Sequence, residues 1–192
     1  MMQQQQHHTL GKAKVGAVAG LVAGCALFSS FFAIDQQLGI PNGTFYKTVG
    51  IPMGLEGAEA IAIGFMAHMS AAALIGATYS AAASKWRTFQ VITPPKGILM
   101  GAVTGLIVFT VFFLPINHLI MTPAIVAEFS ITDQDRLSVE ELEALYSLLV
   151  GSDTVLWYGL WLHVLFGTVM GLMVSFILHD DYKMVKRIKG FW

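Results

Sequence analysis

Four long runs of mostly apolar residues constrain this chain more than any other feature of its sequence. A helix needs about 20 such residues to cross the hydrocarbon core of a bilayer, and no run carries Lys, Arg, Asp or Glu in its central part. Backbone groups in lipid must form their hydrogen bonds internally, so each run is expected to be helical. The sequence predicts an all-α membrane protein with helices at residues 15–34, 58–83, 97–119 and 155–178.

The overall composition agrees with this class. Hydrophobic residues make up 55% of the 192 residues, charged residues only 12%, and the mean hydropathy is +0.65. Soluble domains carry about 25% charged residues, so this chain has too few to cover a water-soluble surface. The single cysteine, Cys25, excludes an internal disulfide and a cysteine cluster for zinc or iron–sulfur.

The charges in the connections predict the orientation. Basic residues gather in the N-terminal tail 1–14, in the short connection after the second run, and in the C-terminal tail 179–192. The outer loops 35–57 and 120–154 hold one basic residue each, and the second is rich in Asp and Glu. The positive-inside rule therefore places both termini in the cytoplasm of a multi-pass plasma-membrane protein, with a transmembrane domain over 15–178.

The four runs also indicate an internal repeat. The segment GAVAGL at 16–21 matches GAVTGL at 101–106, and both lead into a Phe-rich end. The second and fourth runs each contain a histidine, His68 or His163, followed by small residues at every fourth position. We predict a tandem repeat of two helical hairpins. The first run could be a cleaved signal ending before a lipidated Cys25, but its internal match favours a retained helix.

Small residues four apart allow two helix backbones to approach closely in a membrane. This GxxxG pattern predicts that the glycines of the first helix and those of the third helix each form a packing face. Small residues of the second and fourth helices are expected to form packing faces as well. The residues predicted to form these packing faces are Gly16, Gly20, Gly24, Gly76, Gly101, Gly105, Gly167 and Gly171.

The two outer connections differ in character. The first, 35–57, is rich in Gly and Pro and is expected to be irregular. In the second, a Ser138–Glu141 capping box precedes apolar residues at helical spacing, which predicts a short amphipathic helix over 138–150. This helix is expected to lie on the membrane surface or a partner subunit, or simply to cap the bundle.

Histidines inside a membrane invite a functional interpretation because ionisable groups are costly there. His68 and His163 lie at similar depths in equivalent helices. Three interpretations stay open: neutral histidines that hydrogen-bond between helices, a bis-histidine haem or copper site, and a proton relay. If the histidines are neutral and only hydrogen-bond between helices, no cofactor is expected.

Three further polar residues form a candidate entry site. Glu56 and Glu59 bracket the start of the second helix, and His118 ends the third. Carboxylates at a helix N-terminus are stabilised by its dipole, so a structural role competes with a role in cation entry. No nucleotide-binding, nucleophile-elbow or zinc-protease motif is present, which favours a non-enzymatic protein.

Taken together, these elements resemble an uncharacterised family of four-helix integral membrane proteins of bacteria and archaea. The shared pattern is a glycine-rich first helix, His68 with Gly76, a glycine-rich third helix ending near Pro115, and His163 with Gly167 and Gly171. The resemblance implies the fold and lends no activity. The long acidic outer loop and the Gln-rich start depart from the family pattern and suggest an added contact surface.

The sequence thus favours an accessory or structural subunit of a larger membrane complex, with a membrane oxidoreductase or monooxygenase as one candidate host. The expected partners are the lipid bilayer and other membrane subunits, contacted through the glycine faces and the helix at 138–150; nucleic acid is not expected. A small homo-oligomeric carrier or channel is the alternative. A bis-histidine haem or metal protein is the third interpretation.

Overall fold

The computed structural model describes residues 2–86, 89–91, 93–130, 138–149 and 153–178. These residues form helices and short connections, with no β-strand among them. Four helical stretches among the described residues are long and apolar enough to cross a membrane, so the predicted all-α membrane fold is confirmed. They are Thr9–Gln37, Gly57–Lys85, Pro94–Glu128 and Thr154–Ile177.

The chain divides into two compact units. The described residues of the first unit lie within 1–26, 69–107 and 163–178, and those of the second within 27–68 and 108–162. Each unit therefore takes one part of every long apolar helix.

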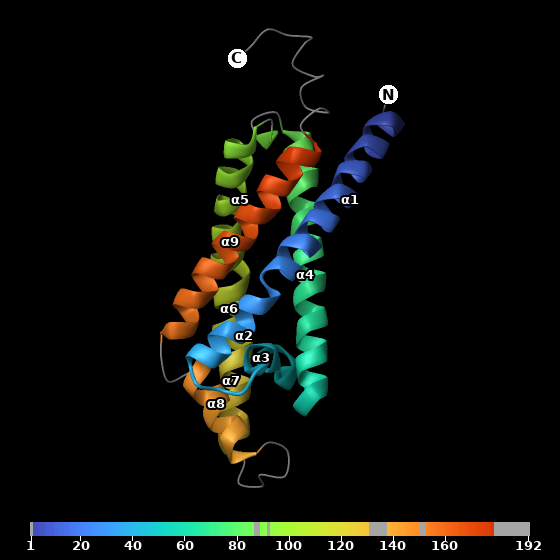
Figure 1. Ribbon diagram of the computed structural model, residues 1–192. Helices are drawn as coiled ribbons and strands as arrows, with labels where there is room; N and C mark the ends of the chain where they lie inside the picture. The colour runs from blue at the N-terminus through green and yellow to red at the C-terminus, as the bar shows by residue number, and fades with distance from the viewer. Residues whose placement is uncertain (1, 87–88, 92, 131–137, 150–152, 179–192) are drawn as a thin grey trace. The chain divides into compact units, whose positions relative to one another are not determined.

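The first unit consists of α1 (Met2–Ala26), the later part of α4 (Gly57–Lys85), α5 (Pro94–Val108) and the later part of α9 (Thr154–Ile177). In this unit α1 crosses α4 obliquely and α5 runs beside α9 (Figure 1). The helix α1 begins at Met2, so most of the segment 1–14, expected to be a tail, is helical. Gln, Lys and Ala favour helices, and nothing before Gly11 interrupts them.

The second unit contains α2 (Phe28–Gln37), α3 (Thr44–Gly50), α7 (Thr122–Ser130), α8 (Val139–Leu149) and the earlier parts of α4 and α9. The helix α8 confirms the amphipathic helix predicted in the second outer connection. The expectation that 35–57 is irregular is wrong, because α3 and a 3₁₀ turn at Ile51–Met53 lie within it.

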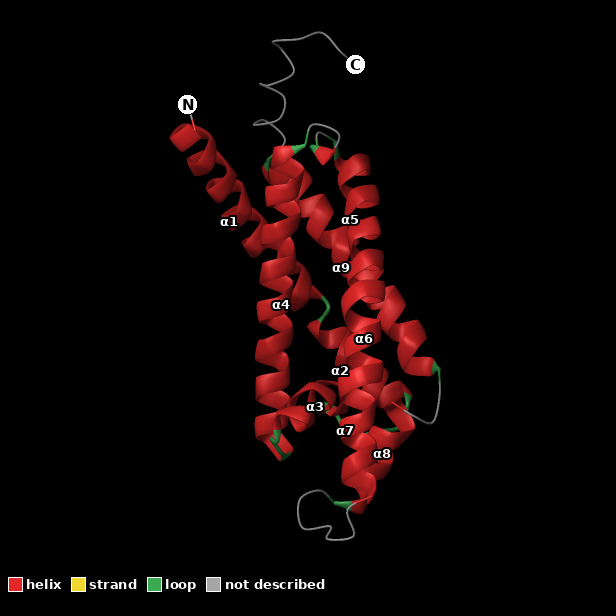
Figure 2. Cartoon of the chain, turned by 180° about the vertical axis from the view of Figure 1, so that it is seen from behind, coloured by secondary structure: helices red, strands yellow, loops and turns green. Residues whose placement is uncertain are grey.

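The core of the second unit explains why these outer segments are ordered. Viewed from behind, α7 and α8 lie side by side near α3 (Figure 2). Their buried side chains join residues of α2 and α4 in one hydrophobic cluster. Its members are Phe31, Phe45, Tyr46, Ile51, Ala60, Met121, Ile125, Leu142, Leu145, Leu148 and Val155.

Two of the four spans are not continuous α-helices. The first is interrupted at Leu27, between α1 and α2, just before the pair Ser29–Ser30, a residue type found at kinks. The third contains Pro115, which lacks a backbone N–H and clashes with the preceding turn. Two π-helical stretches, Phe109–Phe113 (η3) and Asn117–Met121 (η4), flank the short α6 (Leu114–Ile116) that holds this proline.

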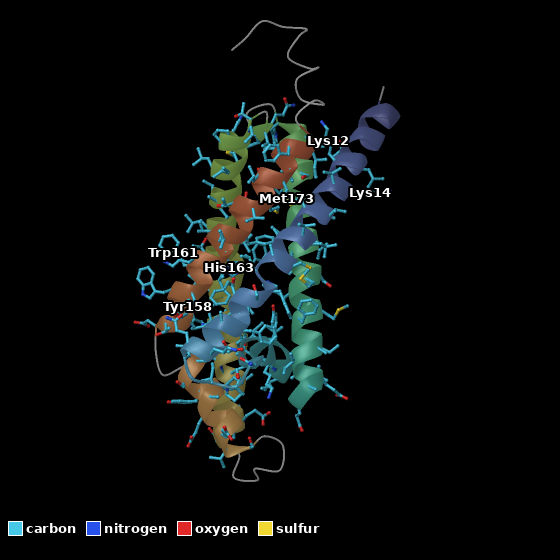
Figure 3. The ribbon with its side chains drawn as sticks, in the orientation of Figure 1. Lys12, Lys14, Tyr158, Trp161, His163 and Met173 are labelled. Carbon is cyan, nitrogen blue, oxygen red and sulfur yellow. The ribbon has the colours of Figure 1, made fainter. Side chains whose placement is uncertain are left out.

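The membrane-exposed surface is apolar. Many large hydrophobic side chains of the spans are exposed, among them Leu74, Leu119 and Phe176. Trp161 on α9 projects outward and is 65% exposed, and Trp157 one turn earlier is also exposed (Figure 3). Tryptophans at the end of a span suit the bilayer interface. The surroundings of the helices are therefore lipid.

Candidate functional site

The glycines of α1 lie directly against α4 in the first unit. A methyl group added at Gly16 would collide with the carbonyl oxygen of Gly76, and one added at Gly20 would collide with that of Ala72. At Gly24 it would come within 3.2 Å of the Ala72 side chain and the sulfur of Met69. As the residue number rises along α1, it falls along α4, so the two helices are antiparallel.

The helices α5 and α9 form a second antiparallel pair of the same kind. A methyl group at Gly97 would meet the carbonyl oxygen of Gly171 at 2.5 Å, and one at Gly101 would collide with that of Gly167. At Gly105 the obstacle is the carbonyl oxygen of His163. The backbones touch through glycine at three successive turns, which only residues without a side chain permit.

The first two glycine contacts of one pair match the first two of the other: Gly16 and Gly97 each meet a glycine carbonyl, and Gly20 and Gly101 each meet the carbonyl one turn earlier on the partner helix. Ser80 of α4 lies against Gly16, and Ser175 of α9 lies against Gly97. These contacts align Gly16 with Gly97, one helical turn away from the alignment of Gly16 with Gly101 that the GAVAGL and GAVTGL segments suggest. Aligning Gly16 with Gly97 also aligns Phe28 with Phe109. The Phe-rich ends therefore agree with the alignment that the contacts give.

Each histidine lies within a row of small residues, four apart, that runs along its helix. The α4 row is Ala60, Gly64, His68, Ala72, Gly76 and Ser80, and the α9 row is Gly159, His163, Gly167, Gly171 and Ser175. Sequence reasoning missed Gly64, Gly97 and Gly159. The signal for Gly64 and Gly159 was available, because each lies four residues before a histidine already singled out.

In the second unit the α4 row packs against α3. A methyl group at Gly64 would collide with the carbonyl oxygen of Tyr46, and one at Gly50 would collide with that of Ala60. On α9, a methyl group added at Gly159 would instead lie 2.8 Å from the ring of Phe113. The small residues of α4 thus leave room for the short helix α3, and the corresponding residue of α9 leaves room for an aromatic side chain.

His68 lies among aromatic rings of the second unit. Its ring centroid is 5.0 Å from that of Phe31 and 6.2 Å from that of Tyr46, and both contacts are edge-to-face. His163 belongs to the first unit, where its carbonyl oxygen faces Gly105. The two histidines thus fall in different units, and a bis-histidine site or a proton relay that uses both stays a prediction.

The three residues of the candidate entry site are all exposed. Glu59 lies in the first turn of α4, where the helix dipole favours a carboxylate. The backbone carbonyl of Glu56 accepts the first bond of that helix, from the N–H of Ala60. His118 lies in the π-helical stretch of the third span. Their role in cation entry stays a prediction.

A buried carboxylate that the sequence did not single out organises the first outer connection. Asp35 at the end of α2 is fully buried, and its carboxylate accepts hydrogen bonds from the backbone N–H of Gly43 at 2.7 Å and of Phe45 at 3.3 Å. These amides belong to the N-terminus of α3, whose donors have no partner within the helix. Gly43 has φ of +91°, which a residue with a side chain rarely adopts.

Potential metal ligands are dispersed in the part of the chain that the structure describes. No three His, Cys, Asp or Glu side chains there lie close enough to share a metal ion. A bis-histidine haem or copper site at His68 and His163 therefore stays a prediction. No family model, curated protein or solved structure matches the chain, so its family resemblance also stays a prediction.

Proposed function

We propose that the chain is a non-enzymatic accessory subunit of a larger membrane complex, built as a tandem repeat of two helical hairpins. The matched contacts of α1 with α4 and of α5 with α9 support the repeat. The glycine faces contact helices of the same chain, so partner subunits are expected to use other surfaces.

The observation that carries the proposal is the folded outer part of the second unit. Bundles of four spans need only short connections, yet here α3 and α8 of the connections pack with residues of the spans in one hydrophobic core. The inner face of α8 contributes Leu142, Leu145 and Leu148 to that core. Such a structure presents a rigid surface, which a partner can recognise without first ordering it.

The outer face of α8 is the partner surface that we propose. Val139 is 52% and Tyr146 39% exposed, and the exposed carboxylates Glu140 and Glu143 lie beside them. Tyrosine is enriched in the centres of protein interfaces, and charged residues in their rims. An apolar strip with an acidic border suits a partner loop that carries basic residues.

Purification tests this proposal. The full chain would be extracted from its native membrane in mild detergent, and every stoichiometric companion identified by mass spectrometry. We expect the double variant Val139→Asp/Tyr146→Asp to lose its companion at least about tenfold, which is about 1.4 kcal/mol of binding free energy. The control Thr93→Asp, an exposed change in the connection before α5, should retain it. Elution of the native chain alone or as a homodimer would contradict the accessory role.

A second candidate is a small homo-oligomeric carrier or channel, with His68, His163 and Glu59 on the path. The interrupted first and third spans favour it, because discontinuous helices form the substrate sites of many transporters. Transport by the purified chain in proteoliposomes would support this function. Full activity of a His68→Ala variant would remove that residue from the path.

A further inference from the structure

Asn117 has an unusual environment in the third span. Its side chain is 1% exposed, and its Oδ1 has no hydrogen-bond partner among the described residues. It lies in a row with Phe113, Met121 and Ile125, four residues apart, and the last two belong to the core of the second unit. An amide oxygen in such apolar surroundings costs free energy unless something donates to it.

A second oxygen without a described partner lies one turn further on. Thr122 Oγ1 is buried and makes no hydrogen bond among the described residues. Two other hydroxyls behave differently: Thr104 of the same span donates to the carbonyl of Met100 at 2.9 Å, and Ser130 at the end of α7 donates to that of Val126 at 2.8 Å. The carbonyl four residues back is the usual acceptor for the hydroxyl of a Thr or Ser within a helix.

The backbone also departs from a regular α-helix at this point. The N–H of Thr122 donates to the carbonyl of Asn117, five residues back, so this turn is wider than an α-helical turn. Pro115, just before it, has no N–H to donate to the carbonyl of the preceding turn. The stretch around Asn117 thus combines two side-chain oxygens with a rearranged backbone, and π-helical turns are frequent at functional sites.

We propose that Asn117 Oδ1 and Thr122 Oγ1 are ligands of a monovalent cation of the size of Na⁺ or K⁺, bound in the third span. Amide and hydroxyl oxygens are hard ligands that suit such ions. No cluster of three acidic, His or Cys side chains occurs in the described residues to balance a divalent ion. Backbone carbonyls of the widened turns and water complete the coordination, as in the interrupted helices of transporters. The site stands independently of the accessory role.

Thermal unfolding of the full chain in detergent tests the site. The midpoint would be measured in NaCl, in KCl and in the chloride of a large organic cation, N-methyl-D-glucamine, at equal ionic strength. Binding to the folded state stabilises it, so one alkali salt should raise the midpoint by about 2 °C or more, in a saturable manner.

The matched variants are Thr122→Val and Thr104→Val. Both make the same change in the same span, but only Thr122 lacks a carbonyl partner among the described residues. We expect Thr122→Val to lose the salt-specific shift and Thr104→Val to keep it. Asn117→Leu should lose the shift as well. If the Asn117→Leu variant does not fold, the Thr122→Val variant alone tests the cation site. Equal midpoints in all three salts, or a full shift in Thr122→Val, would overturn the proposal in favour of bound water.

Discussion

At the scale of single residues, alanine substitutions at Gly11 and Gly16 of α1 are expected to have opposite effects on stability. A methyl group at Gly16 meets the backbone of Gly76, whereas no atom of the described residues lies within 4 Å of one at Gly11. Gly16→Ala should therefore lower the free energy of unfolding by about 1–3 kcal/mol, as overpacking does. Gly11→Ala should leave it unchanged or raise it by about 0.5–1 kcal/mol, because alanine favours a helix.

Both glycine variants can be compared with the native chain by thermal or denaturant unfolding in one detergent. Equal stability of Gly16→Ala and Gly11→Ala would show that α1 does not lie against α4 as described.

Asp35 gives a second residue-scale prediction. Asp35→Ala would leave the N–H groups of Gly43 and Phe45 buried without their acceptor, and each such group costs about 1–3 kcal/mol. We expect α3 to loosen, which limited proteolysis within residues 38–56 would detect. The exposed Glu143→Ala serves as the control and should be cut no faster than the native chain. Native-like resistance of Asp35→Ala would contradict the proposed role of the carboxylate.

The residue scale also shows what sequence reasoning could reach. Glycines at every fourth position of an apolar run identify close helix approaches because no other role in a membrane demands that spacing. The segment match pairs Gly16 with Gly101, whereas the contacts pair it with Gly97, because short small-residue segments match in several registers. Only the neighbours, such as Ser80 and Ser175, distinguish the registers.

At the scale of elements, α8 is the helix whose packing can be tested most directly. Leu145 is fully buried in the core of the second unit, and Ser147 is exposed two residues later. Leu145→Ala should cost about 2–5 kcal/mol, as cavities in cores do, while Ser147→Ala should change stability by less than about 0.5 kcal/mol. Unfolding of the two variants followed by circular dichroism would measure this. Equal stability would mean that α8 does not pack on α3 and α7.

The elements differ in how far the sequence predicts them. Long apolar runs are helical because lipid offers no other partner to the backbone, and α8 followed from a capping box and helical spacing. The helix α3 has neither signal. It is seven residues long, lies between glycines and prolines, and depends on Asp35 and the small residues of α4 for its stability. The π-helical stretches around Pro115 likewise need the folded environment.

At the scale of the whole molecule, the charge pattern predicts the topology. Two single-cysteine chains, made in a Cys25→Ser background, would test it. Ser138→Cys lies before α8 and Thr93→Cys lies before α5, and both positions are exposed. A membrane-impermeant maleimide added to intact cells should label Ser138→Cys, and should label Thr93→Cys only after permeabilisation. The reverse pattern would contradict cytoplasmic termini.

The function of the whole molecule is the property that the sequence predicts least well. The four spans and their lipid surroundings follow from hydropathy alone, since the bilayer acts as a uniform solvent. A partner, a transported solute or a bound ion depends instead on a few polar groups in particular places. Asn117 and Thr122 were passed over because an amide and a hydroxyl are ordinary in sequence; only their burial and their lack of a described partner make them notable.

The contact between α3 and α8 has a consequence for biosynthesis. Nearly 90 residues separate the two helices along the chain, and the ribosome releases α3 long before α8. Until then, the apolar side chains of Phe45 and Tyr46 have no finished core to enter. The core of the second unit can therefore form only after α8 has been synthesised, and a nascent chain arrested before α8 would leave these apolar side chains uncovered.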